Sequence, residues 1–416
     1  MSSFANAADA VVVGGGPAGA TTAWALARNG GDVLVLDRAR FPRSKPCAEF
    51  LSPQGRRILA EMGALDAVIG AGAVDLEAMK IHSVNGHSFE GRFDAARECG
   101  GQRNAGLGVR REILDAILLD RARAAGARVS EGVAVTDVLR DSTGRVCGVR
   151  VRDGDATREI AARVVIGADG LRSVVGRRLG LIRSARWPRR VGFVTHFSGV
   201  EGLGSGGEMH VTRTGYCGLA NVGGGVTNVG MAMPVRFAHG AAGDVAGFME
   251  QWVRAHPALG PRFARAARVT PALATGPFAV HARRAWAPGA ALVGDAADFF
   301  DPFTGEGMFE ALRGGEMLGP YLCTALASNS PRVMDEALAA YDRARRYQFA
   351  DAWRVQKVVA LAVAWPPLLN HTVRAANNSR AIADLVVNVA SGFLSPGELL
   401  RPGILRQLLF PFGPTA

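Results

Sequence analysis

Two glycine-rich turns in this sequence have the composition of a site for phosphate or a nucleotide. The first, Gly14-x-Gly16-x-x-Gly19, stands between an apolar run over residues 10–13 and a helical pattern over residues 20–28. The first glycine allows the bend, the second lets a pyrophosphate approach the backbone, and the third lets helix and strand pack closely. Asp37 ends the next apolar run, where an acid binds the ribose hydroxyls of a dinucleotide. Because an acid at this position disfavours a 2′-phosphate, FAD or NAD fits better than NADP.

The second glycine-rich turn lies late in the chain. An apolar run over residues 290–293 leads into Gly294-Asp295, and Gly305-x-Gly307 opens a long helical pattern. Free N–H groups and the positive end of the helix dipole gather at a helix start. They attract phosphate or the electron-rich edge of a reduced flavin. Taken alone, this stretch fits an ordinary strand-to-helix turn equally well. Because the first glycine-rich turn supplies the other part of a dinucleotide site, a site shared by both turns is the better interpretation.

The elements that must position these turns alternate between strands and helices. We expect an α/β fold in which a Rossmann-like FAD-binding domain is interleaved with an antiparallel-sheet substrate domain and followed by a helical C-terminal region. Short alternating strands between Gly-rich turns predict the antiparallel sheet. The predicted boundaries are residues 1–77, 99–182 and 281–330 for the first domain, 78–98 and 183–280 for the sheet domain, and 331–416 for the helical region.

Two local patterns predict finer detail. Asn85-Gly86 stands between two strand-like segments, which is the signature of a type I′ hairpin turn. The apolar periodicity of residues 372–390 predicts one continuous helix.

Composition narrows the classes of function. The chain of 416 residues carries a net charge of +11, but its basic residues are dispersed and form no nucleic-acid-binding motif. Its 5 cysteines are far apart, which fits a reducing compartment rather than a disulfide framework. The histidines lack metal-ligand spacing, so we expect no metal site. Residues 358–365 form the longest apolar run, too short to span a bilayer. We therefore expect a cytoplasmic protein without a nucleic-acid partner.

Three motifs in a fixed order carry a resemblance to a known family. The first turn with Asp37, a central Gly167-Ala-Asp169-Gly170, and the late Gly294-Asp295 with its Pro/Gly loop are similar to FAD enzymes of the para-hydroxybenzoate hydroxylase fold. The sequence most resembles the geranylgeranyl reductase-like branch, through residues 41–53, the loop over residues 301–307, and the tail over residues 402–409. The resemblance implies bound FAD, with NAD(P)H as a transient electron donor.

The resemblance also implies a set of cofactor-binding residues. Those expected around the FAD pyrophosphate, ribose and adenine are Gly14, Gly16, Pro17, Ala18, Gly19, Asp37, Arg38, Arg111 and Val135. Those expected around the flavin ring are Cys47, Ala48, Pro302, Gly305, Gly307 and Met308, and Asp295 is expected at the ribityl chain or the pyrophosphate. Asp169 and Gly170 belong to a motif that the family uses for contact with FAD and with nicotinamide. On the pattern alone, the alternatives are a helix-surface charge for Arg111 and a core position for Val135.

Two flavin chemistries follow from this assignment, because the cofactor performs the redox step and the protein positions it. The first hypothesis is an NAD(P)H-driven monooxygenase that hydroxylates or epoxidises a hydrophobic or aromatic small molecule. The alternative is a geranylgeranyl reductase-like enzyme that saturates isoprenoid double bonds, with the Cys47 thiol as proton donor or gate. A remote alternative is a non-catalytic prenyl or lipid carrier on the same fold.

Candidate substrate residues lie in the predicted sheet: His196, His210 and Tyr216. The segment after Tyr216 lacks the Trp and Phe-Pro of the geranylgeranyl reductases, which weakens the expectation of a prenyl chain. The tail over residues 394–412 places Arg401 and Arg406 among leucines, so it could lie on a membrane surface or pack on the body.

Overall fold

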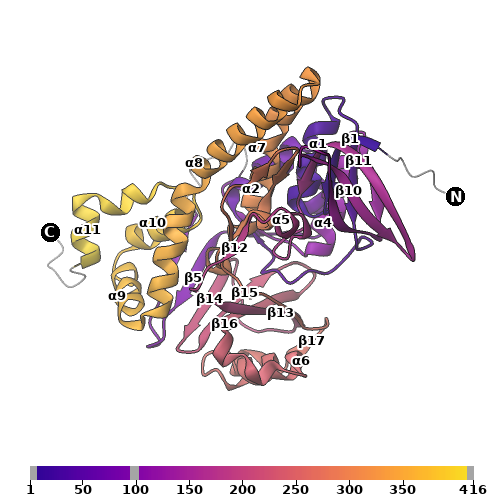
Figure 1. Ribbon diagram of the computed structural model, residues 1–416. Coiled ribbons are helices and arrows are strands. Elements are labelled where there is room, and N and C mark those ends of the chain that lie inside the picture. The colour runs from indigo at the N-terminus through magenta and orange to yellow at the C-terminus, as the bar shows by residue number, and fades with distance from the viewer. Residues whose placement is uncertain (1–6, 94–102, 410–416) are drawn as a thin grey trace.

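The computed structural model describes residues 7–93 and 103–409 and builds them into two large sheets with a group of helices at the C-terminal end (Figure 1). The predicted α/β class is confirmed. The predicted boundary between residues 98 and 99, Cys99, and the last residues of the predicted tail lie outside the described residues.

The first sheet is built around a parallel core. Strand β1 (Ala7–Val13) pairs in parallel with β2 (Val33–Asp37) on one side and β11 (Ala156–Gly167) on the other. The sheet is completed by β8 (Arg128–Glu131), β9 (Val133–Arg140), β10 (Val146–Asp153), β20 (Trp286–Ala287) and β21 (Ala290–Leu292). Both faces of β1 are buried: Ala10 and Val12 face one core cluster, and Val11 and Val13 face another. This explains why the strand is an unbroken apolar run.

Helices cover one face of this sheet. They are α1 (Pro17–Ala27), α2 (Pro53–Glu61), α3 (Leu65–Gly70), α4 (Arg111–Ala124) and α7 (Gly307–Ser328). The β9–β10 meander and α5 (Val174–Arg178) pack on the other face. The carboxyl ends of β1, β11 and β21 therefore meet at one edge, where an open α/β sheet binds ligands.

The second sheet draws on distant parts of the chain. Its strands, in spatial order, are β17 (Ala267–Arg268), β13 (Arg190–Ser198), β16 (Val226–Pro234), β15 (Gly215–Asn221), β14 (Gly207–Thr212), β5 (Ala78–His82) and β6 (Ser88–Arg92), with β18 (Leu273–Thr275) beside β13. All pairs are antiparallel except β14 with β5, which is parallel. Helix α6 (Val245–Ala255) covers the face that carries Phe193 and Phe197.

Short elements connect the two sheets. One small sheet joins β3 (Phe50–Leu51), β4 (Val74–Leu76) and β7 (Gly106–Gly108), and another joins β12 (Ile182–Ser184), β19 (Val280–Ala282) and β22 (Asp298–Phe299). Single 3-10 turns occur at η1 (Val235–Phe237), η2 (His239–Ala241), η3 (Pro261–Phe263), η4 (Gly294–Ala296), η5 (Pro302–Thr304) and η6 (Pro396–Leu400).

The last three C-terminal helices and the end of the first one pack against the second sheet and lie at the left of Figure 1, while the first one begins at the top, against the helices of the first sheet. The C-terminal helices are α8 (Pro331–Ala364), α9 (Pro366–Asn377), α10 (Arg380–Ala390) and α11 (Pro402–Leu409). The single helix predicted over residues 372–390 is wrong, because the chain breaks at Asn378-Ser379. The Ser379 hydroxyl accepts from the Ile382 N–H at 3.4 Å and begins α10 anew. Within the described residues, no helix is both long and apolar enough to cross a bilayer.

The turn between β5 and β6 also differs from the prediction. A type I′ turn needs positive φ at both central residues, but only Gly86 has it, at 85°. The Gly86 N–H donates to the Ser83 carbonyl at 3.0 Å, and the Asn85 carboxamide oxygen accepts from the Ser83 hydroxyl at 2.6 Å. These bonds close a longer loop in which the Asn85 side chain replaces a backbone partner.

Candidate flavin site

The first glycine turn joins β1 to α1 and leaves no room for side chains. A Cβ on Gly14 would lie 2.5 Å from the Ala168 carbonyl oxygen, and one on Gly19 would lie 1.8 Å from the Gly14 oxygen. Gly14 also has a φ of 103°. Only glycine fits these two positions, so the start of α1 presents bare backbone N–H groups to whatever binds there.

Asp37 acts on this turn directly. Its carboxylate accepts from the Gly15 N–H and from the Ala39 N–H, each at 2.8 Å. The acid at the end of β2 therefore fixes the turn in shape, and Arg38 beside it is exposed. Neither residue borders the cavity at the sheet edge, so their predicted contacts with ribose stay predictions.

A cluster of cations lies over the turn. A Cβ on Gly16 would lie 3.4 Å from Nη2 of Arg43 and 3.8 Å from Nη2 of Arg111. Both guanidiniums share the buried carboxylate of Asp115, at 3.0 Å and 2.8 Å. Lys45 also borders the cavity, and burial, then the neighbouring Arg111, lowers its pKa. These positive charges beside bare N–H groups fit a pyrophosphate.

Asp295 follows β21 and borders the same cavity. Burial raises its pKa, while the charges of Lys45 and Arg111 act in the opposite direction. A carboxylate in this position can accept hydrogen bonds from the hydroxyls of a bound cofactor.

The Pro/Gly loop before α7 is held by side chains of the second sheet. The Tyr216 hydroxyl donates to Oδ1 of Asp301 at 2.6 Å, and Arg190 binds Oδ2 at 2.5 Å. Burial, then the Asp301 charge, holds the pKa of Tyr216 well above its usual range. A Cβ on Gly305 would lie 2.6 Å from the Phe50 ring, and the φ of Gly305 is 74°. This fixed loop points the amino end of α7, with Gly307 and Met308, at the cavity.

Cys47 borders the cavity from the loop before β3. Burial raises the pKa of its thiol, which therefore stays protonated at neutral pH. The Asn228 side chain donates to its carbonyl oxygen at 3.0 Å. Glu49, two residues on, has a φ of 56°, unusual for a residue with a side chain. Its carboxylate contacts His196 Nε2 at 2.6 Å and accepts from the Arg111 N–H at 2.7 Å.

The structure brings most of the predicted site residues together. The cavity at the sheet edge is bordered by Gly16, Pro17, Ala18, Cys47, Ala48, Arg111, Gly170, Asp295, Pro302, Gly305, Gly307, Met308 and Tyr216. Its remaining wall is largely apolar: the second sheet contributes Val194, Met209 and Met231, and the segments around the small β12–β19–β22 sheet contribute Phe278 and Phe299.

Other predicted residues lie elsewhere. Val135 is in the core beneath the meander, and its role at the adenine stays a prediction. Asp169 accepts from the Val174 N–H at 2.6 Å, but its other oxygen is buried without a partner in the described protein. His196 borders a neighbouring small cavity with Glu49. His210 is buried outside the cavity, stacked on His82 at 4.1 Å between ring centroids.

Sequence reasoning missed several residues of the site. Arg43, Lys45 and Glu49 stand in the same loop as Cys47, and their closeness in the sequence to this predicted site residue was a usable signal. Glu310 borders the cavity one turn into α7, where its spacing gave no signal. Its carboxyl accepts from the Gln356 amide at 3.0 Å, and burial, then the nearby Asp298 and Asp295, raises its pKa to about 7.

Comparison with known proteins agrees with this geometry. Residues 7–194 match the family model described as an FAD binding domain. The chain is 31% identical over 355 residues to digeranylgeranylglycerophospholipid reductase 2 of Methanopyrus kandleri, an alignment that covers 83% of this chain and 82% of that protein. The chain belongs to the geranylgeranyl reductase-like family of FAD enzymes. It is therefore an FAD-dependent oxidoreductase.

Solved structures share the fold of the present chain over nearly its whole length. A geranylgeranyl bacteriochlorophyll reductase-like protein of Thermoplasma acidophilum has a TM-score of 0.78 at 22% identity, covering 95% of this chain and 99% of its own. The flavin-dependent brominase Bmp2 has a TM-score of 0.80 at 18% identity, covering 98% of this chain and 99% of its own. At these identities the likeness establishes the fold alone.

The residues present fit FAD. The bare turn with Arg43, Arg111 and Lys45 would hold the pyrophosphate, and Asp295 would face the ribityl hydroxyls. The amino end of α7 would face the flavin ring, where its dipole and N–H groups favour the negative charge of the reduced state. Exposed interactions of this kind contribute about 0.3–1 kcal/mol, and partly buried ones more.

Proposed function

We propose that this enzyme adds hydrogen across a carbon–carbon double bond of a long apolar substrate, with electrons from NAD(P)H. The observation that carries the proposal is the position of the buried Cys47 thiol, whose pKa is raised by burial, on the largely apolar wall of the cavity beside the predicted flavin position. The relationship to a reductase of an isoprenoid lipid over most of both chains supports it further.

The protein's part in this reaction is to orient the alkene and supply a proton. When bound, reduced FAD would supply a hydride to one alkene carbon. The Cys47 S–H bond breaks as its proton joins the other carbon. Arg111, whose charge favours ionised Cys47, stabilises the thiolate left behind until solvent returns a proton. Met209, Met231 and Phe278 present apolar surfaces that would exclude water from the alkene.

Monooxygenation, the first hypothesis from the sequence, has no comparable group in the described site. A phenol or aromatic acid would find polar side chains such as Thr275 and Gln356 in the cavity, but they stand in a largely apolar wall, and the Tyr216 hydroxyl is already donated to Asp301. We therefore prefer reduction of a double bond over monooxygenation. Insertion of oxygen into the product would contradict this choice. The carrier hypothesis predicts no turnover with any electron donor.

Substitution of Cys47 tests the proposed role of its thiol. We expect Cys47→Ala to keep its FAD and its reduction by NAD(P)H, but to lose alkene reduction by about 10²–10⁴-fold, the usual contribution of a general acid. Cys47→Ser should retain part of the rate, with a changed pH profile. Rapid-reaction measurements separate the two half-reactions. Alkene reduction at the wild-type rate in Cys47→Ala would refute the proton-donor role.

A further inference from the structure

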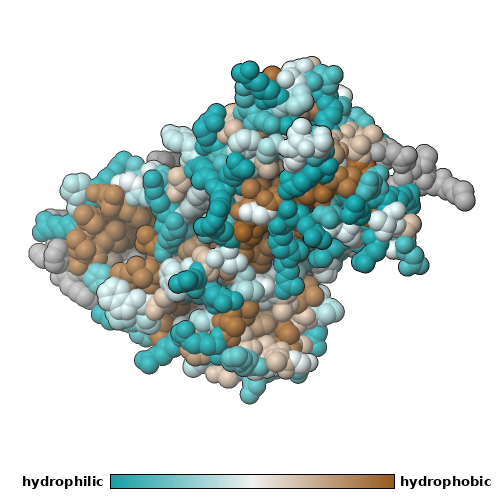
Figure 2. Space-filling model, viewed as in Figure 1, coloured by the Kyte–Doolittle hydropathy of each residue, from teal (hydrophilic) through white to brown (hydrophobic). Residues whose placement is uncertain are grey.

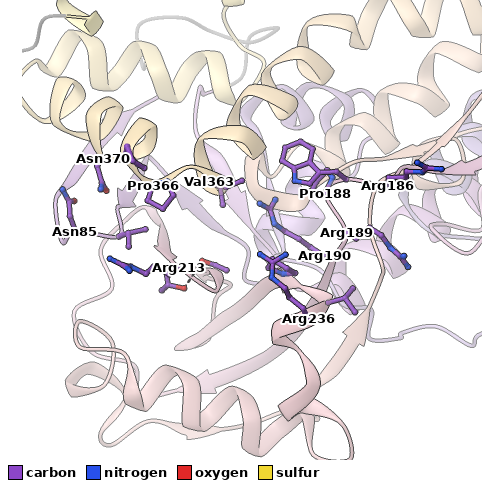
Figure 3. A pocket seen from close by; sticks show the side chains of 18 residues that line it. Asn85, Arg186, Pro188, Arg189, Arg190, Arg213, Arg236, Val363, Pro366 and Asn370 are labelled. Atoms are coloured by element: carbon purple, nitrogen blue, oxygen red, sulfur yellow. Dashed lines mark hydrogen bonds between the residues drawn. The ribbon is translucent and has the colours of Figure 1, made fainter.

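A second cavity, of about 790 Å³, lies between the second sheet and the C-terminal helices (Figure 3). One wall comes from the loop before β13 and from the ends of β14 and β16, and the other from the junction of α8 with α9. We call this cavity the arginine groove. Its arginines are Arg186, Arg189, Arg190, Arg213 and Arg236, and none of its lining residues is acidic.

The charge of the arginine groove is not balanced within the described part of the chain. Arg190 is buried and binds Asp301. The other four guanidiniums are on exposed residues and have no carboxylate partner among the described residues. Elsewhere arginines are commonly paired, as Arg57 is with Glu61 and Glu316. Cations gathered around one cavity repel each other, so they favour an anion between them.

The groove also has an apolar side. Trp187 is 49% exposed and Val235 is 39% exposed on the sheet side, and Val363 and Pro366 face them from the helices. Figure 3 shows Val363 and Pro366 above Arg190 and Arg236. Guanidiniums match the paired oxygens of phosphate, and the apolar surfaces match a hydrocarbon attached to it. This combination fits an amphiphile with a phosphate head better than a small inorganic ion.

Arg190 connects the groove to the flavin cavity. It borders the groove, while its partner Asp301 and Tyr216, which donates to Asp301, border the flavin cavity. The two cavities therefore share a wall of three bonded side chains. A head group held in the groove would lie on the opposite side of this wall from the place where an alkene would be reduced, so its attached chain would pass around the wall to reach the flavin cavity.

We propose that the arginine groove is a second anion site, distinct from the site for FAD, which binds the phosphate or diphosphate head of the substrate. The proposal rests on the proposed function for the identity of the attached chain. It predicts that the enzyme distinguishes substrates by their head as well as by their double bonds, so that a neutral head is bound more weakly than a phosphorylated one.

Binding to the FAD-loaded enzyme tests the groove without turnover. The probes are a polyprenyl diphosphate and the polyprenyl alcohol of the same length, titrated calorimetrically. Hydrogen bonds to a charged group are strong enough that we expect the diphosphate to bind at least about tenfold more tightly. Arg213→Ala/Arg236→Ala should lose this preference while keeping its affinity for the alcohol and its FAD. Arg213→Lys/Arg236→Lys should keep part of the preference for the diphosphate.

A matched control uses two exposed arginines that do not line the groove, Arg152 on β10 and Arg177 on α5. Their double alanine variant removes the same charge and should leave the preference intact. Equal loss in both variants would mean a general charge effect and would overturn the proposal. So would an unchanged preference in Arg213→Ala/Arg236→Ala.

Further measurements in the same experiment identify which molecule supplies the phosphate. Inorganic diphosphate should displace the polyprenyl diphosphate but bind more weakly, and equal affinity would overturn the proposed amphiphile, since the chain would contribute nothing. A raised KM for NADPH alone in Arg213→Ala/Arg236→Ala would assign the groove to the electron donor and overturn the head-group proposal. Arginine-dependent binding without alkene reduction would instead sustain the groove and refute the proposed function.

Discussion

At the scale of single residues, the flavin cavity is governed by a few buried charges. Lys45, Arg43 and Arg111 bring positive charge to the glycine turn, and Asp115 and Asp295 bring negative charge beside them. Because burial removes water from these groups, each affects the others more strongly than it would at the surface. Binding of an anionic cofactor should therefore depend on individual side chains.

Asp295 provides the first prediction at this scale. Asp295→Ala removes the carboxylate expected to accept from the cofactor hydroxyls, and loss of a hydrogen bond to a charged group costs about 1.5–3 kcal/mol. The affinity for FAD should therefore fall by about ten- to a hundredfold. Flavin content and titration of the apoprotein measure it. Asp335→Ala, which loses the Arg145 ion pair outside the cavity, should keep full flavin, and equal loss in both would contradict the assignment.

Glu310 gives a prediction about pH. Its pKa is raised from 4.5 to about 7 by burial, so the folded apoprotein binds this proton more tightly than the unfolded chain. The associated stability is fully present below pH 4.5 and is lost as the pH rises through about 7, a change on the order of 3 kcal/mol. Glu310→Gln should remove this decline.

Chemical unfolding of the apoprotein at several pH values measures this effect. Glu316→Gln is the control with the opposite sign, because hydrogen bonds from Arg57 and Arg313 lower the pKa of Glu316 despite its burial. Its stabilising effect is present above the ordinary pKa and is lost as the pH falls. Identical pH profiles for Glu310→Gln and the wild type would show that Glu310 is not the titrating group.

At the scale of elements, close packing of α1 on α7 sets the position of the flavin-facing helix start. A Cβ on Gly315 would lie 2.7 Å from the Ala18 carbonyl oxygen and 2.9 Å from the Thr22 nitrogen, both backbone atoms. Gly315→Ala should therefore push the helices apart, destabilise the protein by about 1–3 kcal/mol and weaken FAD binding.

Gly403 offers the matched control for this substitution. It lies in the exposed helix α11, where an added Cβ would meet nothing within 4 Å. Gly403→Ala should be neutral or slightly stabilising, since alanine favours a helix. Thermal unfolding with and without FAD measures both variants. If Gly315→Ala kept the stability and the flavin affinity of the wild type, the packing argument would be contradicted.

Some elements and contacts of this fold could be predicted from the sequence, and others could not. The β1–α1–β2 unit and the glycine turns were predictable because apolar runs, turn residues and helix starts are local signals. The Tyr216–Asp301–Arg190 contacts were not, since they join residues 85 and 111 positions apart. The break at Asn378-Ser379 was missed because apolar periodicity continues across it, and only the Ser379 cap marks the new helix start.

At the scale of the whole molecule, the C-terminal end carries an exposed apolar surface. Figure 2 shows apolar side chains gathered over the C-terminal helices at the left. Leu400 is 68% exposed, Leu405 37% and Leu409 55%, with Arg401 and Arg406 exposed among them. This arrangement supports the proposal that the tail lies on a membrane surface, which would bring the enzyme to an apolar substrate.

Vesicle binding tests this surface. Leu400→Ser/Leu405→Ser/Leu409→Ser should reduce sedimentation with vesicles of anionic phospholipid by about tenfold or more, because each leucine buried in lipid contributes about 1.5–3 kcal/mol. Activity on a detergent-dispersed substrate should not change. The control Val358→Ser/Leu361→Ser removes exposed apolar side chains from α8 instead, outside the tail. Equal binding by the wild type and the tail variant would refute the membrane role.

The mass of the product tests the central claim most directly. The FAD-loaded enzyme is supplied with NAD(P)H and a polyprenyl lipid, once in air and once without oxygen, and the products are weighed by mass spectrometry. Our account predicts a gain of two hydrogen atoms per reduced double bond, with oxygen not required. A gain of one oxygen atom, formed only in air, would contradict it and establish the enzyme as a monooxygenase.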